Sequence, residues 1–402
     1  MSDASSKSLQ GASADLEVNA GKTRIWIRVG KLFDGQSRQP LRDAHLVYDS
    51  DTILFVGSDN PSRELLRPDQ EAPDAVLTDV IALPGLIEAH AHLFLEGGEL
   101  ELEKRNRHLK QTSEQLLALA KPRFSRLLQV AVMAVRDAGD KDGVGLSLNS
   151  DFRGRTRDSA LTPYIDSPGA AIHRRGRYGK FMAEALELHD SLEECVEARL
   201  RAGAGRIKLI PTGIINFKAG KVTSSPQMSV AEVTEIVKAA RVRGCQTFAH
   251  ASGTDGIENA IEGGVDSVEH GFFITDEQLA KMRDRSIAWV PTFAPVQEQV
   301  DHADIVGWDE TVVSHLRRIL DEHARSLCRA HEMGVVVIAG SDAGSYGVAH
   351  GYGLLDELCL MESAGMPSVD VLRSATGSSA GRLAFREKFG VLEAGHKKCA
   401  AT

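Results

Sequence analysis

Gln246-Thr-Phe-Ala-His250 and Asp266-Ser-Val-Glu-His270 are two short apolar runs, each of which ends in a histidine. The stretch before them, 230–244, has a helical period and is therefore predicted as a helix. The apolar positions on one face of this helix are Val230, Val233, Ile236, Val237 and Ala240. Short β-rich runs that alternate with helical stretches are typical of repeated βα units and a parallel sheet.

Eight such runs follow one another along the chain. They are 81–94, 133–138, 168–173, 206–211, 247–251, 265–270, 288–293 and 335–339. Eight parallel strands favour the α/β class and a (β/α)8 TIM-type barrel. Polar residues that could take part in catalysis lie repeatedly at the downstream ends of these runs. Barrels of this type carry their active sites at that end.

A different pattern precedes the barrel. Three short β-type runs, 24–30, 44–48 and 52–57, are separated by turn-forming residues and predict a small antiparallel sheet. We expect a flexible tail over 1–20, a small N-terminal β-domain over 21–80, the barrel over 81–385 and a short C-terminal remnant of the β-domain over 386–402. The ending lacks a β pattern, so we expect the C-terminal part of the β-domain to be truncated and an exposed sheet edge to be covered by homo-oligomerisation.

Composition narrows the possible partners. The 402 residues contain 47 Lys plus Arg against 56 Asp plus Glu, which gives a net charge of −9 and disfavours nucleic acid. No run approaches the roughly 18 apolar residues of a membrane span, and the amino terminus lacks the pattern of a secretory signal. We therefore expect no membrane partner, a cytoplasmic protein and a small-molecule substrate.

Histidines and an aspartate at the strand ends indicate a metal site. His90 and His92 stand two residues apart, so on a strand both side chains point to one side and can bind one ion. This pair alone is also compatible with two ordinary hydrogen-bonded histidines. His250 and His270 end consecutive strands, and Asp342 follows the last one; packing alone does not explain such convergence.

Lys208 lies within the apolar run Arg206-Ile-Lys-Leu-Ile-Pro211. Burial makes a charged ammonium costly, and a neutral lysine can react with carbon dioxide to form an anionic carbamate that bridges two ions. The alternative is a barrel lysine that is paired with an acid.

This ordered set resembles the amidohydrolase superfamily in its binuclear form with a carboxylated lysine. The motifs are similar to those of the branch that holds Xaa-Pro dipeptidases, arginine or lysine carboxypeptidases and ochratoxin-hydrolysing amidases. They are Ile207-Lys-Leu-Ile-Pro-Thr-Gly, Ala249-His-Ala-Ser-Gly-Thr-Asp-Gly-Ile, Val268-Glu-His-Gly, Val290-Pro-Thr and Gly340-Ser-Asp-Ala-Gly. The resemblance covers about 24–395, nearly the whole chain.

The resemblance implies a mechanism and a set of metal ligands. His90, His92 and Asp342 would hold one divalent ion and His250 and His270 the other, with carboxylated Lys208 and a hydroxide between them. Zn²⁺ is the expected metal. The hydroxide would attack an amide next to a terminal carboxylate, in a peptide or an N-acyl amino acid, and Asp342 would transfer the proton.

Substrate contacts are expected after the third strand and near the last one. His173 matches a position where this branch places a histidine near the substrate, so we expect a catalytic and binding role for it. Arg174 and Tyr178 are candidates for binding a carboxylate, and His350 for lining the pocket. The alternative for the basic segment around Arg174 is a solvated surface.

Other reactions stay open at this point. The same binuclear site could hydrolyse an ester, lactone, carbamate, urea or organophosphate. Deamination is disfavoured, because deaminases of the superfamily usually hold one metal and lack the lysine at the position of Lys208. A metal-binding scaffold without activity is the remaining alternative, and the intact ligand set counts against it.

Overall fold

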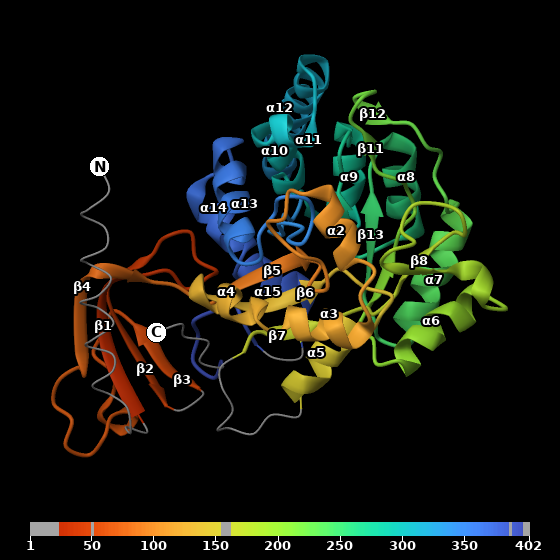
Figure 1. Cartoon of the computed structure of the whole chain (residues 1–402). Coiled ribbons are helices and arrows are strands. Elements are labelled where there is room, and N and C mark those ends of the chain that lie inside the picture. The colour runs from red at the N-terminus through yellow and green to blue at the C-terminus, as the bar shows by residue number, and fades with distance from the viewer. Residues whose placement is uncertain (1–23, 50–51, 154–161, 386–387, 397–402) are drawn as a thin grey trace. The chain divides into compact units, whose positions relative to one another are not determined.

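The computed structural model of the chain describes residues 24–49, 52–153, 162–385 and 388–396 (Figure 1). The predicted tail over 1–20 lies outside them. The described residues form two compact units, one within Met1–Leu86 and Thr376–Thr402 and the other within Ile87–Ala375. The positions of the two units relative to each other are not determined, so each is described by itself.

The smaller unit is built on a four-stranded sheet in the order β3-β2-β1-β4. The three predicted runs form antiparallel neighbours, and β4 adds a fourth strand parallel to β1. The sequence analysis missed β4. The strands are β1 (Arg24–Leu32), β2 (Leu41–Asp49), β3 (Ile53–Gly57) and β4 (Ala75–Ala82), and the short helices of this unit are η1 (Arg63–Leu65) and α15 (Gly377–Leu383).

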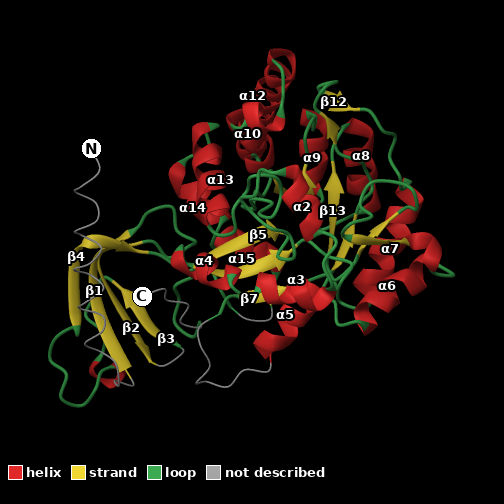
Figure 2. Cartoon of the chain, viewed as in Figure 1, coloured by secondary structure: helices red, strands yellow, loops and turns green. Residues whose placement is uncertain are grey.

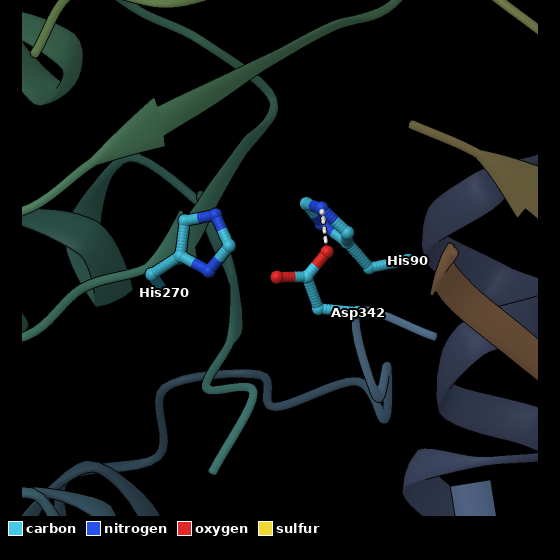
Figure 3. Close-up of side chains that lie close together, drawn as sticks. All are labelled: His90, His270 and Asp342. Atoms are coloured by element: carbon cyan, nitrogen blue, oxygen red, sulfur yellow. Dashed lines mark ion pairs between the residues drawn. The ribbon is translucent and has the colours of Figure 1, made fainter. Parts of the chain in front are cut away.

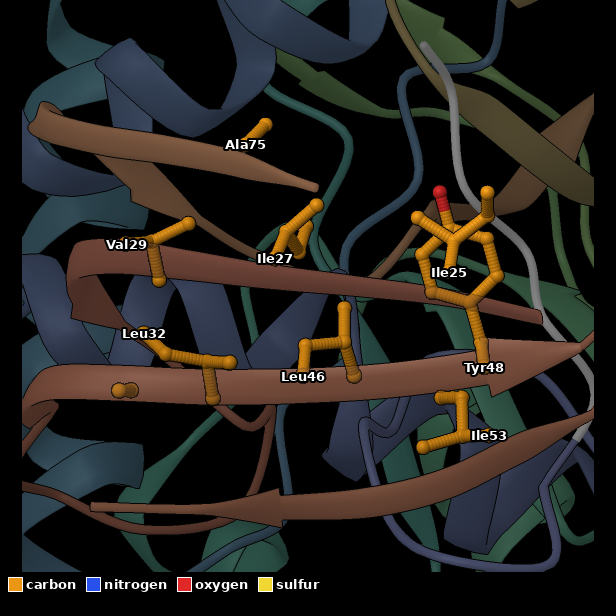
Figure 4. Packing of buried hydrophobic residues seen from close by; sticks show 9 residues of the cluster. Ile25, Ile27, Val29, Leu32, Leu46, Tyr48, Ile53 and Ala75 are labelled. Carbon is orange, nitrogen blue, oxygen red and sulfur yellow. The ribbon is translucent and has the colours of Figure 1, made fainter. Parts of the chain in front are cut away.

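One face of this sheet carries an apolar core (Figure 4). Ile25, Ile27 and Val29 alternate along β1 and are buried, as the two-residue period of a strand requires. Leu46 and Ile53 from β2 and β3 complete the same layer. Each such side chain stabilises the fold by about 1.5–3 kcal/mol relative to an exposed one.

The C-terminal segment contacts this sheet without forming a named strand within 388–396. Leu392 N donates a hydrogen bond to Asp34 O at 2.9 Å. Ile53, the first residue of β3, accepts from Gly395 N and donates to His396 O, each at 2.8 Å. The segment thus satisfies backbone groups at the start of β3, and the predicted truncation stays a prediction.

The larger unit confirms the α/β class. Its strands form a six-stranded parallel sheet in the order β15-β14-β13-β10-β8-β9 and a three-stranded parallel sheet β5-β6-β7 (Figure 2). The strands are β5 (Leu86–Ala91), β6 (Val132–Asp137), β7 (Tyr164–Asp166), β8 (Ala171–His173), β9 (Ala183–Ala185), β10 (Ile207–Leu209), β13 (Thr247–Ala251), β14 (Ser267–His270) and β15 (Ala288–Val290), with a separate hairpin of β11 (Ile215–Asn216) and β12 (Lys221–Val222).

Three of the eight predicted runs differ in detail. The run 81–94 is divided between β4 and β5, since Pro84 lies between them. The run 168–173 forms β8, which pairs with β10, while the strand beside β6 is the upstream β7. The run 335–339 is not a named strand, although Val337 forms a parallel bridge to Trp289.

Residues after Val335 nevertheless link the two sheets. Ile338 N donates to Trp289 O on β15, and Ala89 N on β5 donates to Ala339 O, both at 2.9 Å. Gly340 permits this approach, because a Cβ there would lie 2.8 Å from His90 Cβ. These bonds place the eighth run between β15 and β5, and closure of the whole barrel stays a prediction.

Helices follow most of the strands (Figures 1 and 2). In the predicted helix 230–244, α7 buries Val233, Ile236, Val237 and Ala240 as expected, but Val230 is exposed at its first turn. The helices are α2 (Leu102–His108), α3 (Ser113–Ala120), α4 (Arg123–Gln129), α5 (Val144–Arg153), η2 (Leu186–Leu188), α6 (Leu192–Arg201), α7 (Val230–Val242), α8 (Thr254–Gly263), α9 (Asp276–Asp284), α10 (Ala294–Asp301), α11 (Ala303–Val306), α12 (Glu310–Met333), α13 (Tyr352–Ser363) and α14 (Ser368–Ser374).

None of the helices within the described residues is both long enough and apolar enough to span a bilayer.

His323 lies on the buried face of α12, inside an aromatic cluster. Its ring stacks on Phe272 with centroids 4.0 Å apart and meets Trp289 edge-on at 5.2 Å. Its Nε2 donates to Pro291 O at 2.9 Å. Burial lowers the pKa of His323 from 6.5 to about 4. The residue is therefore neutral in the folded protein well below the pH at which it would charge in an unfolded chain.

This buried histidine predicts a loss of stability in acid. The contribution of neutral His323 to the free energy of unfolding is fully present above about pH 6.5. It is lost as pH falls from about 6.5 to about 4, because in this range the histidine binds a proton only in the unfolded chain. The full loss is on the order of 3 kcal/mol. In urea unfolding, wild type should lose more stability between about pH 7 and about pH 5 than His323→Phe does. His331→Phe, on the same helix and only partly buried, is the control, and equal losses in wild type and His323→Phe would contradict the prediction.

Candidate metal centre and active site

The parallel strands of the larger unit bring the predicted polar residues to one place. Register explains part of this, because Lys208 on β10 lies beside Phe248 on β13, and His250 on β13 lies beside Glu269 on β14. The predicted ligands are all buried: His90 on β5, His92 directly after it, Lys208 on β10, His250 on β13, His270 at the end of β14 and Asp342 after the run 335–339.

His90, His270 and Asp342 form the centre of this group (Figure 3). Each offers one ligand atom, and these atoms lie within 4.8 Å of one another. Asp342 Oδ1 is 3.6 Å from His90 Nε2 and 3.5 Å from His92 Nε2. The ring of His250 lies beside that of His270, with centroids 4.4 Å apart. Four imidazoles and a carboxylate therefore converge at distances that suit ions between them.

Unpaired buried atoms provide a test of whether this group fits metal ions. Within the described residues, no hydrogen-bond partner is present for His90 Nε2, His250 Nε2, Lys208 Nζ or Asp342 Oδ1. Most buried polar atoms in proteins are hydrogen-bonded, since leaving one unpaired costs about 1–3 kcal/mol. Imidazole nitrogen and carboxylate oxygen are ligands that Zn²⁺ prefers. The donor set fits a metal site.

Further residues orient the histidine rings. His90 Nδ1 is 2.6 Å from Glu269 Oε2, and Arg136 binds both oxygens of Glu269 at 2.9 and 2.8 Å. His270 Nδ1 lies 2.8 Å from Thr292 Oγ1, which itself donates to Pro291 O. A hydrogen on Nδ1 leaves Nε2 free to bind a metal, and such contacts are how proteins fix ligand orientation. The sequence analysis missed Glu269, Arg136 and Thr292.

Burial dominates the electrostatics of the site. It lowers the pKa of His92 and of His250 to about 3, with the charge of Lys208 as the next cause. It also lowers the pKa of Lys208 to about 8 and raises the pKa of Asp342 to about 7. Neutral imidazoles are the form that binds metal. With a pKa close to neutral pH, part of the lysine is present as an uncharged, nucleophilic amine. Formation of a carbamate requires this form.

The backbone is strained at three residues of the site. His270, Thr292 and Asp342 have φ values of 67°, 53° and 56°, in the left-handed region. This conformation is rare outside glycine, and for the β-branched Thr292 it is an outlier. Strain of this kind costs about 1–3 kcal/mol a residue and concentrates at functional sites.

A cavity of about 320 Å³ opens onto the group, a size typical of small-molecule sites. Its polar lining includes His92, Lys208, His250, His270 and Asp342. Tyr178, a predicted substrate contact, lines the cavity as well, and its ring lies 5.3 Å from that of His250. Most of the remaining lining is apolar. Arg105 is a cation in the lining that the sequence analysis did not select.

The other predicted substrate contacts lie outside this lining. His173 is buried at the end of β8 beside Gly179. Arg174 donates to Gln227 O at 2.8 Å and forms ion pairs with Glu187 and Glu232. His350 is buried, and its Nε2 donates to the backbone oxygen of His92 at 3.1 Å. Two arginines that precede the basic segment around Arg174 in the sequence, namely Arg155 and Arg157, lie outside the described residues.

Comparison with known proteins identifies the family and agrees with the fold. The profile of the amidohydrolase family matches residues 81–400. A crystal structure of a Xaa-Pro dipeptidase with bound methionine is similar with a TM-score of 0.77 and 26% identity, covering 93% of this chain and 92% of that one. The ochratoxinase of Aspergillus niger is 23% identical over 383 residues, which are 88% of this chain and 75% of that protein. An uncharacterised protein of Mycobacterium tuberculosis is 29% identical over 303 residues, covering 75% of this chain and 74% of its own length.

The larger unit combines a parallel α/β architecture with a buried cluster of histidines and an aspartate at the strand ends. The chain belongs to the amidohydrolase family. It is a hydrolase that acts on C–N bonds, and its resemblance to the dipeptidase and ochratoxinase branch is confirmed.

Proposed function

We propose that this enzyme hydrolyses an amide bond next to a terminal carboxylate, in a dipeptide or an N-acyl amino acid, with two divalent ions. The observation that carries the proposal is a set of four buried atoms that have no hydrogen-bond partner among the described residues, on His90, His250, Lys208 and Asp342, beside a cavity of small-molecule size. A site that leaves so many polar atoms unpaired is built for a ligand that is not part of the chain.

Each residue of the group has a place in this proposal. His90, His92 and Asp342 would hold one ion and His250 and His270 the other, with Lys208 between them as a carboxylated, anionic bridge. Two ions that share a water molecule lower its pKa toward neutrality and polarise the scissile carbonyl. Zn²⁺ is the proposed metal, because nitrogen ligands dominate the set.

Asp342 would move the proton. Ser345 Oγ donates to its Oδ2 at 2.7 Å, which leaves Oδ1 without a hydrogen bond on the side of His90 and His92. Burial raises the pKa of Asp342 to about 7 in the metal-free protein. In the reaction, Oδ1 would take the proton of the attacking water and deliver it to the departing nitrogen.

The relatives support the same class of bond. One relative of known structure is a Xaa-Pro dipeptidase, and another relative is an ochratoxinase. As part of the proposal, we extend their class of reaction to this chain. Tyr178 is proposed as a substrate contact from its place in the cavity. Roles for His173, Arg174 and His350, the closed barrel, a cytoplasmic location and homo-oligomerisation stay predictions.

The experiment that tests the proposal is a substrate panel with product analysis. Zn²⁺-loaded enzyme is incubated with N-acyl amino acids and dipeptides, and in parallel with lactones, carboxylic esters and phenylureas. We expect release of the free amino acid from the first group. Cleavage confined to lactones, esters or phenylureas would contradict the proposed bond and favour the other electrophiles open to the same site.

A further inference from the structure

Arg105 lies on α2, and its side chain lines the active-site cavity. Its Nη2 donates to Gly344 O at 2.9 Å and its Nη1 to Glu96 O at 3.0 Å, with a longer bond to Ser345 O at 3.4 Å. Gly344 and Ser345 follow Asp342 directly in the chain. These bonds hold the guanidinium beside the loop that carries the proposed proton carrier.

Among the described residues, no carboxylate oxygen lies within 4.0 Å of a guanidinium nitrogen of Arg105, so Arg105 forms no ion pair with them. Three other buried or half-buried arginines of this unit have such partners: Arg136 pairs with Glu269, Arg206 with Asp166, and Arg174 with Glu232. Buried Arg123 resembles Arg105 instead, since its guanidinium donates to the backbone oxygen of Leu93 and forms no ion pair with a described carboxylate. Arg105 is half-buried, and removal from water lowers its pKa. The carboxylate of Asp342 acts on Arg105 from beyond this distance and partly offsets this lowering of the pKa. A cation that is partly withdrawn from water and has no carboxylate in direct contact favours an anionic ligand.

Tyr346 adds a polar group to the cavity lining beside Arg105. Its ring lies under the guanidinium of Arg105, with the centroid 5.9 Å from Cζ. Its hydroxyl is buried and has no hydrogen-bond partner among the described residues. Both side chains line the cavity. A carboxylate could accept hydrogen bonds from both, which is a common way of binding this group.

The rest of the lining limits what else the substrate contains. Most of it is formed by apolar side chains from several elements, among them Leu95, Phe181, Ile214, Phe217, Phe272 and Val296, while Ser252 and Gln299 are polar members. Surfaces of this kind gain free energy from bulky apolar groups and lose it when a charge is buried against them. The substrate that fits therefore has one carboxylate and is otherwise large and mainly apolar.

We propose that Arg105, together with Tyr346, binds the terminal carboxylate of the substrate and so selects N-acyl amino acids with bulky apolar groups. The proposal rests on the function proposed above and names the residue that recognises the carboxylate. It moves this role from Arg174, whose guanidinium is already paired with Glu187 and Glu232.

The test compares two substrates that differ only in the anion. Wild type, Arg105→Gln and Arg105→Lys are assayed with an N-acyl phenylalanine and with the same compound as its C-terminal primary amide, and release of the acyl group is measured. Wild type should prefer the acid by at least about 10-fold in kcat/KM. Arg105→Gln should raise KM for the acid by about 10- to 100-fold and leave that for the amide within about 2-fold, with Arg105→Lys in between.

Arg107→Gln is the matched control, since Arg107 is on the same helix, exposed and absent from the cavity lining. A merely structural role for Arg105 would lower kcat for both substrates alike, and that result would overturn the inference. So would an equal preference of wild type for acid and amide. If wild type cleaves neither compound while it cleaves lactones or phenylureas, the proposed function fails, and this inference fails with it.

Discussion

Asp342→Asn is expected to lower kcat by about 10²- to 10⁴-fold while metal binding is largely retained. The amide keeps the size of the side chain and one oxygen that can bind metal, but it cannot take up a proton. Asp342 Oδ1 has no hydrogen bond in the structure and lies 3.5 Å from His92 Nε2, where a proton carrier would stand beside the ions. Steady-state kinetics with an N-acyl amino acid, together with metal analysis of the same sample, measures both effects.

The matched control is Asp304→Asn, because Asp304 is exposed on α11 and outside the cavity lining. It should behave as wild type. An Asp342→Asn enzyme that retains most of the wild-type kcat would remove Asp342 from proton transfer. Loss of both metals along with activity would instead make Asp342 a ligand without a separate role in the chemistry.

Lys208 is expected to show the second large effect. Lys208→Met should lower the metal content from about two ions per chain toward one or none and reduce kcat/KM by at least about 10²-fold, because the proposed bridge carries a negative charge that Met lacks. Lys208→Glu supplies a carboxylate on a shorter side chain. It should therefore retain more metal and more activity than Lys208→Met, as measured by metal analysis and hydrolysis of an N-acyl amino acid.

This ranking separates the carbamate from an ordinary buried lysine. If Lys208 acts as a cation that pairs with acids, Lys208→Glu places a like charge among them and should be the worse variant. Equal metal content in wild type and Lys208→Met would also contradict the bridge. Lys238→Met, at an exposed position of α7, controls for the loss of a lysine elsewhere.

Sequence reasoning could place the metal-binding candidates because local patterns carry them. His250 and His270 each end a short apolar run, and the register of β13 and β14, which pairs Ala251 with His270, brings the centroids of the two rings to 4.4 Å from each other. Lys208 stood out as a charge inside an apolar strand. The structure brings these residues together, and their role as ligands is the proposal that the variants above test.

The residues that orient the ligands carried a weaker signal. Glu269 precedes His270 in its strand, and Arg136 lies in the apolar run of β6, so both are charges in buried strands like Lys208. Attention to every charged residue in such runs would have found them. Their pairing is not readable from the sequence, because 133 residues separate the two side chains.

The position of Arg105 at the cavity and the ends of the strands are determined by tertiary structure, which local sequence patterns do not reveal. Arg105 lies on a short helix and reaches the cavity through its bond to Gly344, 239 residues away. The parallel pairing of β4 with β1, in which Ile27 lies beside Ala75, also joins segments that are not adjacent in the sequence. The run 335–339 has a strand-like composition, yet its pairing is reduced to a bridge at Val337 and single hydrogen bonds, because the chain turns toward Asp342 with a left-handed φ.

The central claim is that metal ions held by this group cleave an amide beside a carboxylate. The most direct measurement follows hydrolysis of an N-acyl amino acid while metal is removed with a chelator and Zn²⁺ is then added back in steps. Activity should disappear with the metal and return in full at about two ions per chain. Hydrolysis that persists in enzyme without metal, or that saturates at one ion per chain, would contradict the binuclear site.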